Sequence, residues 1–218
     1  MTVDLYWIPL GAGGHVVAFN GRVFEALAAR RAHRTRRALY HAALIVDAGG
    51  ERYAIELGPD GGASGDGAVF TGPVGARWAG RLRIFRYELR CSPRVTIPDL
   101  AWAVGGPRRV SRDPAVAQRI VALAPSVPRL TWGRDEARTG EMWNSNSVVA
   151  WLLHSAGLPA ASLRPPEGGR APGWDAGVML SRRRRTSTAL GEGARVPSVA
   201  LPRDATNSEV PQTPAQRA

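Results

Sequence analysis

The sequence predicts an α+β fold, in which a small antiparallel sheet packs against helices. Two β-rich runs, "YHAALIVD" and "ERYAIELG", flank a turn with two glycines, which is typical of a β-hairpin. Two later segments, "RDPAVAQRIVALAPS" and "NSNSVVAWLLHSAG", combine apolar helical spacing with helix start and stop signals. Strands followed by helices, rather than a regular alternation of the two, favour this class over a parallel α/β fold.

Length and composition predict one domain followed by a tail. The chain has 218 residues, 44% of them hydrophobic, which is enough for one core of ordinary size. We expect this α+β domain to span residues 1–180. Residues 181–218 are rich in Arg, Pro, Ser and Thr and poor in large apolar side chains, so we expect a disordered tail there.

The first third of the domain is predicted to hold two hairpins separated by a helix. "VDLYWIPL" and "HVVAFN" are β-like and joined by "GAGG". A dinucleotide site would need a helix to start at the last glycine, and the β-like run excludes it. Residues 21–37 carry a helical stripe that ends in arginines, which suit a helix C-terminus. The hairpin over residues 40–57, which turns at Gly49–Gly50, follows.

The remaining elements follow in order. Residues 58–75 are predicted to form a Gly- and Pro-rich loop, and "RLRIFRYELRC" alternates as a strand does. Asp113 as N-cap and Pro114 at the first position begin a helix. A polar loop leads to a second helix, Asn144–Ala156, which Gly157 ends. Because no Glu or Gln stands three residues after Asn144, we expect no complete capping box there.

Charge and residue usage narrow the function classes. The net charge is +11, and every basic side chain apart from histidine is arginine, which indicates a coding bias. The positive field favours anionic partners but is weak evidence for nucleic acid. There is no apolar run long enough to span a membrane and no basic N-terminal region of a signal peptide, so we expect a cytoplasmic protein. Cys91 is the only cysteine, and neither a metal nor a cofactor is predicted.

The hairpin places a histidine and a carboxylate on neighbouring strands. His41 begins one strand, and counting from the turn puts Glu56 diagonally across the ladder, within reach of a long side chain. A carboxylate beside an imidazole fixes its tautomer and stabilises its protonated form. A base with its orienting partner and an ordinary surface ion pair are equally good interpretations of this pair.

The second helix begins with small polar residues. Ser145 shares a helical stripe with Val149 and Leu152, so we expect it to face inward. The free N–H groups and positive end of a helix lower the pKa of a nucleophile and can stabilise an oxyanion. Ser and Asn are also the preferred N-caps, so a helix cap is the alternative interpretation.

"YHAALIVDAGGERYAIEL", followed later by "WNSNSVVAWLL", resembles the circularly permuted papain-like superfamily, which includes permuted NlpC-type peptidases, PPPDE-like peptidases and LRAT-like acyltransferases. The resemblance implies that His41 is the general base, Glu56 its orienting partner and Ser145 the nucleophile. The family uses a cysteine where this chain has Ser145. Further residues expected at the substrate are Trp143, Asn144, Asn146 and Trp174.

Three functions remain open at this stage. The leading hypothesis is a hydrolase or acyltransferase that acts on a peptide, acyl or other small carbonyl substrate at an amide, isopeptide or ester bond. The second is an inactive binding module on the same scaffold. The third is an Arg-rich protein associated with anions or nucleic acid. "PPEGGRAPGWDAG" holds Arg170, Trp174 and Asp175 in a Gly- and Pro-rich frame that could fold over a cleft. The oligomeric state is not predicted.

Overall fold

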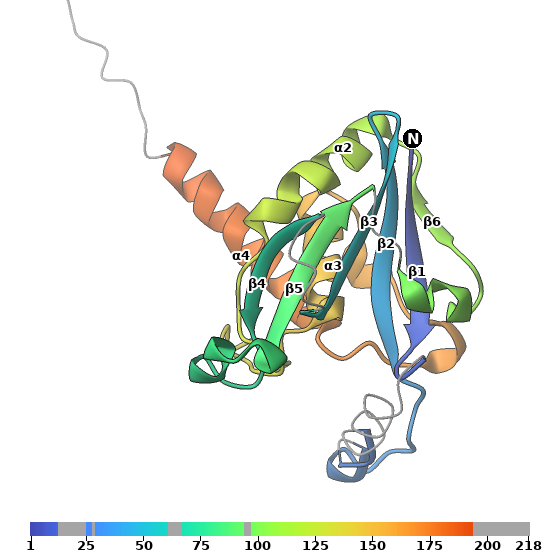
Figure 1. The fold of residues 1–218 in the computed structure, drawn as a ribbon, viewed down its shortest axis with the longest axis vertical. Coiled ribbons are helices and arrows are strands. Elements are labelled where there is room, and N and C mark those ends of the chain that lie inside the picture. The colour runs from blue at the N-terminus through green and yellow to red at the C-terminus, as the bar shows by residue number, and fades with distance from the viewer. Residues whose placement is uncertain (13–24, 28, 61–66, 94–96, 194–218) are drawn as a thin grey trace, which may run out of the picture.

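The protein contains a six-stranded antiparallel sheet, which confirms the predicted α+β class (Figure 1). The computed structural model describes residues 1–12, 25–27, 29–60, 67–93 and 97–193. The strands lie in the order β4-β5-β3-β2-β1-β6. Their bounds are β1 Thr2–Pro9, β2 Tyr40–Ala48, β3 Glu51–Pro59, β4 Ala68–Pro73, β5 Arg86–Ser92 and β6 Arg108–Ser111.

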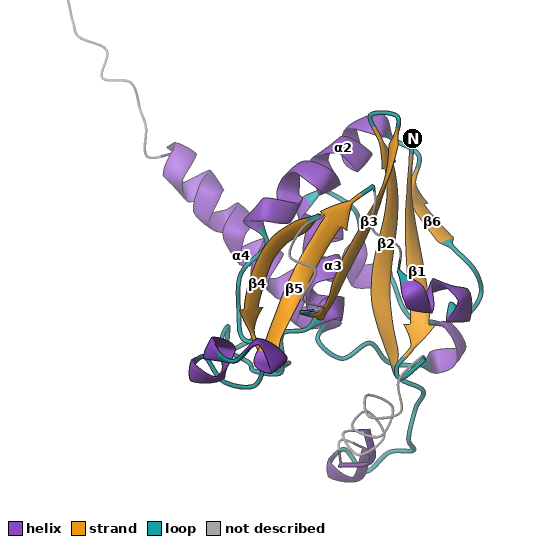
Figure 2. Ribbon diagram, viewed as in Figure 1, coloured by secondary structure: helices purple, strands orange, loops and turns teal. Residues whose placement is uncertain are grey.

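Three helices cover one face of this sheet (Figure 2). They are α2 Pro114–Leu123, α3 Ser145–Ser155 and α4 Trp174–Gly193. α3 lies between the sheet and α4, and its residues from Ser145 to Leu153 are all buried. Short 3-10 helices occupy the connections: η1 Trp78–Arg81, η2 Arg83–Phe85, η3 Pro98–Trp102, η4 Ala124–Ser126, η5 Ala160–Ser162 and η6 Pro166–Gly168.

Both faces of the sheet are covered near β1 and β2, by different parts of the chain. On the helix side, Ala42, Leu44 and Val46 of β2 join the main core with α2, α3 and α4. On the other side, Ala43 and Ile45 join a smaller core with Tyr6, Ile8, Ala54 and Ile97, next to η3. Successive side chains of a strand point to opposite faces, so the parity of each residue on β2 decides which core it joins.

The hairpin and both predicted helix starts are confirmed. β2 and β3 pair antiparallel around Gly49 and Gly50, both with positive φ. At α2, Asp113 accepts a hydrogen bond from the Ala115 N–H at 2.8 Å, and Pro114 is the first helical residue. These signals depend on the local backbone, so they can be recognised in the sequence without knowledge of the tertiary contacts.

α3 has a complete capping box, contrary to our expectation. Ser147 Oγ accepts a hydrogen bond from the Asn144 N–H at 3.1 Å, and Asn144 Oδ1 accepts one from the Ser147 N–H at 3.3 Å. A serine at the third helical position therefore does what a Glu or Gln does in the usual motif. It is fixed there because its hydroxyl also donates to the Gly173 carbonyl at 2.7 Å.

Four other predictions need correction. β5 begins at Arg86, and residues 81–85, predicted as strand, form turns of 3-10 helix because their side chains are exposed and have no sheet to pair with. β4 lies within the predicted loop over residues 58–75. In the predicted helix over residues 21–37, residues 25–27 and 29–31 are helical, but the chain leaves the helix before Arg34, which turns back to Glu25.

The fourth correction concerns the tail, predicted to begin at residue 181. α4 instead continues to Gly193, because its arginines find partners: Arg183 donates to the Ala137 carbonyl at 2.6 Å, and Arg184 lies over the Trp151 ring at 5.2 Å. Residues 194–218 lie outside the described residues, as does the predicted strand over residues 15–20.

Candidate functional site

His41 and Glu56 lie on the same face of the sheet, with Asp99 of η3. His41 pairs with Ile8 of β1, and Glu56 pairs with Arg90 of β5, so both side chains point to the smaller core. Burial lowers the pKa of His41, and the Asp99 carboxylate opposes this. Burial raises the pKa of Glu56, Arg90 opposes it and Asp99 adds to it. The carboxylate that acts on His41 is thus Asp99, no hydrogen bond or ion pair joins His41 to the predicted partner Glu56 among the described residues, and burial favours a neutral imidazole.

Ser145 lies on the other side of the sheet. It is the first residue of α3, which packs on the face that carries Tyr40, Ala42 and Leu44. The side chain of His41 points away from that face, and no hydrogen bond joins it to Ser145 or to any other hydroxyl or thiol in the described part of the chain. Ser145 is 6% exposed, and its hydroxyl has no partner among the described residues. The structure therefore does not bring together the three residues expected to act as a triad.

The two asparagines that flank Ser145 hold the fold. Asn144 caps α3 and donates from Nδ2 to the Pro172 carbonyl at 2.8 Å. Asn146 donates from Nδ2 to the carbonyls of Tyr40 at 3.0 Å and Pro172 at 2.9 Å. Both side chains are buried and tie the start of α3 to β2 and to the segment before α4. The cap interpretation accounts for Asn144, and the bridging role accounts for Asn146.

The two tryptophans expected at the substrate are buried. Trp143 is 2% exposed and belongs to the main core. Trp174 is 4% exposed, donates from Nε1 to the Ala160 carbonyl at 2.9 Å and packs on the Trp7 ring at 4.8 Å between centroids. Trp174 nevertheless forms part of the wall of a cavity, whereas the hollow that Trp143 lines with Leu130 and Ala176 has no room for a bound molecule.

That cavity, here called the arginine pocket, has a volume of about 270 Å³ and lies beside the first turn of α4. Its polar wall consists of Arg37, Arg164, Arg170, Glu141 and Asp175, and Trp174 contributes apolar surface. These residues come from the lead-in to β2, the loop before α3, the loop after η5 and α4 itself. The pocket thus forms only when segments far apart in the sequence meet.

Main-chain pairing fixes Arg170 against β2. The Tyr40 N–H donates to the Arg170 carbonyl, and the Arg170 N–H donates to the Ala38 carbonyl, both at 2.8 Å. Gly169 makes this approach possible, because a Cβ there would lie 2.4 Å from an atom of the Tyr40 ring. One wall of the pocket is therefore a short strand-like pairing rather than an unsupported loop.

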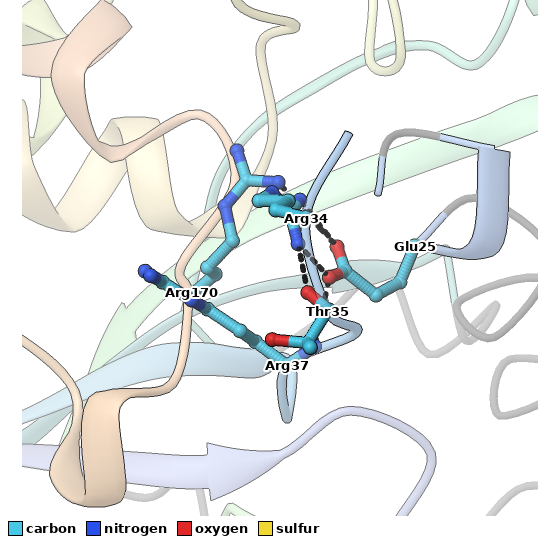
Figure 3. A network of polar contacts seen from close by, with 5 residues as sticks. All are labelled: Glu25, Arg34, Thr35, Arg37 and Arg170. Atoms are coloured by element: carbon cyan, nitrogen blue, oxygen red, sulfur yellow. Dashed lines mark hydrogen bonds and ion pairs between the residues drawn. The ribbon is translucent and has the colours of Figure 1, made fainter. Parts of the chain in front are cut away.

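A buried carboxylate organises the arginines behind the pocket (Figure 3). Glu25 accepts hydrogen bonds from Arg34 Nη1 at 2.5 Å and from the Arg37 N–H at 2.9 Å, and Arg170 Nη1 lies 3.4 Å away. Burial raises the pKa of Glu25, but the hydrogen bonds from Arg34 and Arg37 outweigh it and hold the pKa below its usual value. Glu25 therefore stays ionised and positions two guanidinium groups.

The side chain of Arg37 is the available cation of the pocket. Only its main-chain N–H contacts Glu25, and its guanidinium extends away from that carboxylate (Figure 3). The guanidinium is exposed and has no hydrogen-bond or ion-pair partner within the described ranges. Glu141, by contrast, accepts the Gly173 N–H at 2.9 Å at the start of α4, and burial raises its pKa. The pocket thus offers an unengaged cation, while its inner carboxylate is occupied by the helix.

Sequence reasoning found part of this site. "GGRAPGWDAG" indicated Arg170, Trp174 and Asp175 as a group, and these three line the pocket. Arg37 and Arg164 were missed, because in a chain whose basic residues are so abundant neither stands out. Glu25 was missed as well; an acidic residue inside an arginine-rich segment was the available signal.

Comparison with known proteins gives no match: no family model, no curated protein and no solved structure resembles this chain closely enough to be reported. Within the described ranges, no helix has the length and apolarity needed to cross a bilayer. In the same part of the chain, no three His, Cys, Asp or Glu side chains form a group that could hold a metal ion. The assignment of a function therefore depends on the geometry alone.

Proposed function

We propose that the chain is a binding module for a small molecule that carries a carboxylate or phosphate group, which occupies the arginine pocket. The observation that carries this proposal is the unengaged guanidinium of Arg37 at a cavity of about 270 Å³. Hydrogen bonds between a guanidinium and an anionic oxygen are among the stronger ones in proteins. A cavity with apolar surface and a few convergent polar groups is the usual form of a ligand site.

The preorganised wall supports the proposal. Arg170 is held by main-chain pairing and by Glu25, and the pocket side of Trp174 is held by its hydrogen bond to Ala160. Side chains that are already ordered lose less entropy when a ligand binds. The ligand would therefore meet a rigid wall at Arg170 and Trp174, with Arg37 closing on its anionic group from the exposed side.

We favour a binding module over a hydrolase. Acyl transfer by a serine needs a base within hydrogen-bond reach of its hydroxyl, directly or through one water. His41 points to the other face of the sheet. As a fold hypothesis, the permuted papain-like architecture stays compatible with the order of His41, Glu56 and Ser145 along the chain, and the module would then be a member that binds without cleaving.

Calorimetric titration tests the proposal. The probes are inorganic phosphate, acetate and one short peptide made with a free and with an amidated C-terminus. We expect binding of at least one anion, and we expect Arg37→Gln to weaken it about tenfold or more, because a hydrogen bond to a charged group contributes about 1.5–3 kcal/mol. Arg37 is the cleanest variant, since its side chain supports no described part of the fold.

Arg52→Gln is the matched control. Arg52 is also exposed and lies at the β2–β3 turn, where only a 4.0 Å ion pair with Asp47 involves it. The control lowers the net charge of the molecule by the same amount, but Arg52 does not line the pocket, so the affinity should stay unchanged. Equal losses in Arg37→Gln and Arg52→Gln, or no heat with any of the probes, would overturn the proposal.

A further inference from the structure

The connection between β4 and β5 carries a group of exposed apolar side chains. Loop 77–86 holds η1 and η2 and projects beyond the ends of the two strands (Figures 1 and 2). Trp78 is 73% exposed, Leu82 56%, Ile84 84% and Phe85 43%. These four residues lie within eight positions of the chain. Isolated exposed apolar residues are ordinary, but such a group marks an interaction surface.

Arginines alternate with these apolar residues. Arg81 and Arg83 are exposed, and their guanidinium groups have no hydrogen-bond or ion-pair partner among the described residues. No Asp or Glu occurs from Gly67 to Tyr87. The loop therefore presents positive charge together with apolar surface, and nothing in its own sequence neutralises it.

The backbone of the loop is held, although its side chains are exposed. Arg86 donates from Nε to the Gly80 carbonyl at 2.6 Å and from Nη2 to the Arg81 carbonyl at 3.2 Å. The Val74 N–H donates to the Phe85 carbonyl at 2.8 Å, and Arg77 pairs with Glu136 at 2.7 Å. The apolar side chains thus project from a preformed frame, and placing them in a partner needs no refolding.

Further cations lie next to the loop. Arg134 donates from Nε to the Gly75 carbonyl at 2.5 Å, and Arg183 of α4 donates to the carbonyls of Ala137 and Arg138. Residues 134–138 therefore contact the loop, through Glu136 and Arg77, and also Arg183 of α4. The whole protein carries a net charge of +11. A net charge of this sign favours an anionic partner for the surface.

We propose that loop 77–86 docks on an anionic lipid surface. Trp78, Leu82, Ile84 and Phe85 would enter the interface between headgroups and acyl chains, where tryptophan is favoured. Arg81 and Arg83 would lie at the level of the lipid phosphates. A small projecting loop of alternating cationic and apolar residues matches a lipid surface, where a layer of charged headgroups covers apolar acyl chains. Charge complementarity selects anionic lipids over neutral ones. The proposal is independent of the arginine pocket.

Sedimentation with lipid vesicles tests this proposal. The full chain is mixed with phosphatidylcholine vesicles that either contain or lack phosphatidylserine. We expect binding to the vesicles with phosphatidylserine, and a decrease as salt is added. Ile84→Ser should weaken binding about tenfold or more, from the loss of one buried aliphatic side chain. Arg81→Gln and Arg83→Gln should each cost about fivefold, from the attraction of one cation to an anionic surface.

Trp102→Ser is the matched control for the apolar variant. Trp102 is 62% exposed, but it belongs to η3 on another part of the molecule. Its substitution should leave vesicle binding unchanged. Equal weakening by Trp102→Ser and Ile84→Ser would overturn the proposal, as would no binding to either kind of vesicle. A dimer in ultracentrifugation that Ile84→Ser dissociates, without vesicle binding, would assign the loop to self-association and also overturn it.

Discussion

Gly177→Ala should loosen the contact between α3 and α4, on which the arginine pocket depends. A Cβ at Gly177 would lie 2.0 Å from the Ser147 carbonyl oxygen, 2.8 Å from the Ser147 carbonyl carbon and 2.9 Å from the Trp151 nitrogen. Ordinary contacts begin at 3.4 Å. All three atoms belong to the backbone of α3, so none can rotate aside, and the two helices must separate by more than an ångström.

The cost follows from two opposing contributions. Overpacking of a core costs about 1–3 kcal/mol and occasionally more, whereas alanine in place of glycine inside a helix gains about 1 kcal/mol. Separation of the helices also strains the 2.7 Å hydrogen bond from Ser147 Oγ to the Gly173 carbonyl. Because all three contacts are with backbone atoms, we take the upper end of the overpacking cost and expect a net loss of about 2 kcal/mol. For a domain of this size that loss lowers Tm by roughly 4–8 °C.

Urea unfolding followed by circular dichroism measures this loss. Gly58→Ala is the matched control, because nothing lies within 4 Å of a Cβ placed there. We expect the midpoint of Gly177→Ala to fall and that of Gly58→Ala to stay close to that of the unchanged chain. If the two variants lose equal stability, or if Gly177→Ala loses none, the close approach of α3 and α4 is refuted.

Three further predictions concern individual side chains. A serine-reactive fluorophosphonate should give no labelling that depends on both Ser145 and His41, because the two lie on opposite faces of the sheet; labelling lost in Ser145→Ala and in His41→Ala would contradict that geometry. Glu25 has a pKa below its usual 4.5, so its contribution to the free energy of unfolding is complete above that pH and is lost as the pH falls through the lower value of the folded state. Glu25→Gln should therefore reduce the loss of unfolding free energy on acidification, as measured by denaturation at a series of pH values. An unchanged pH dependence would count against the ion pair between Glu25 and Arg34. Burial raises the pKa of Tyr87 to about 12, so ultraviolet titration should show one late phase that Tyr87→Phe removes.

Local signals predicted the elements that they control. The glycine turn gave the β2–β3 hairpin, and Asp113 with Pro114 gave the start of α2, because each of these motifs acts within a few residues. No helix was predicted where α4 lies, and a tail was expected from residue 181 because four consecutive arginines look like a solvated run. Their partners are carbonyls of residues 137 and 138 and the Trp151 ring, all distant in sequence.

The arginine pocket was only partly predictable, for a related reason. Arg170, Trp174 and Asp175 are close in sequence and could be grouped, but Arg37 reaches the pocket through a pairing between residues 38–40 and residue 170. Such a pairing adds a short parallel bridge at the end of a strand. No periodicity in the sequence predicts such an isolated bridge between Leu39 and Arg170.

The separation of His41 from Ser145 follows from the parity of one strand. A strand with one wet face shows an alternation that reveals which residues point to the core, but β2 is apolar on both faces, with Leu44 and Val46 on one and Ile45 on the other. A shift by one residue exchanges the faces, and it is Tyr40, not His41, that points to α3. The order of a histidine, a glutamate and a serine along the chain can therefore match that of a catalytic family although the side chains do not meet. Whether they meet depends on which face of β2 carries His41, and the hydrophobic pattern of this strand does not distinguish its two faces.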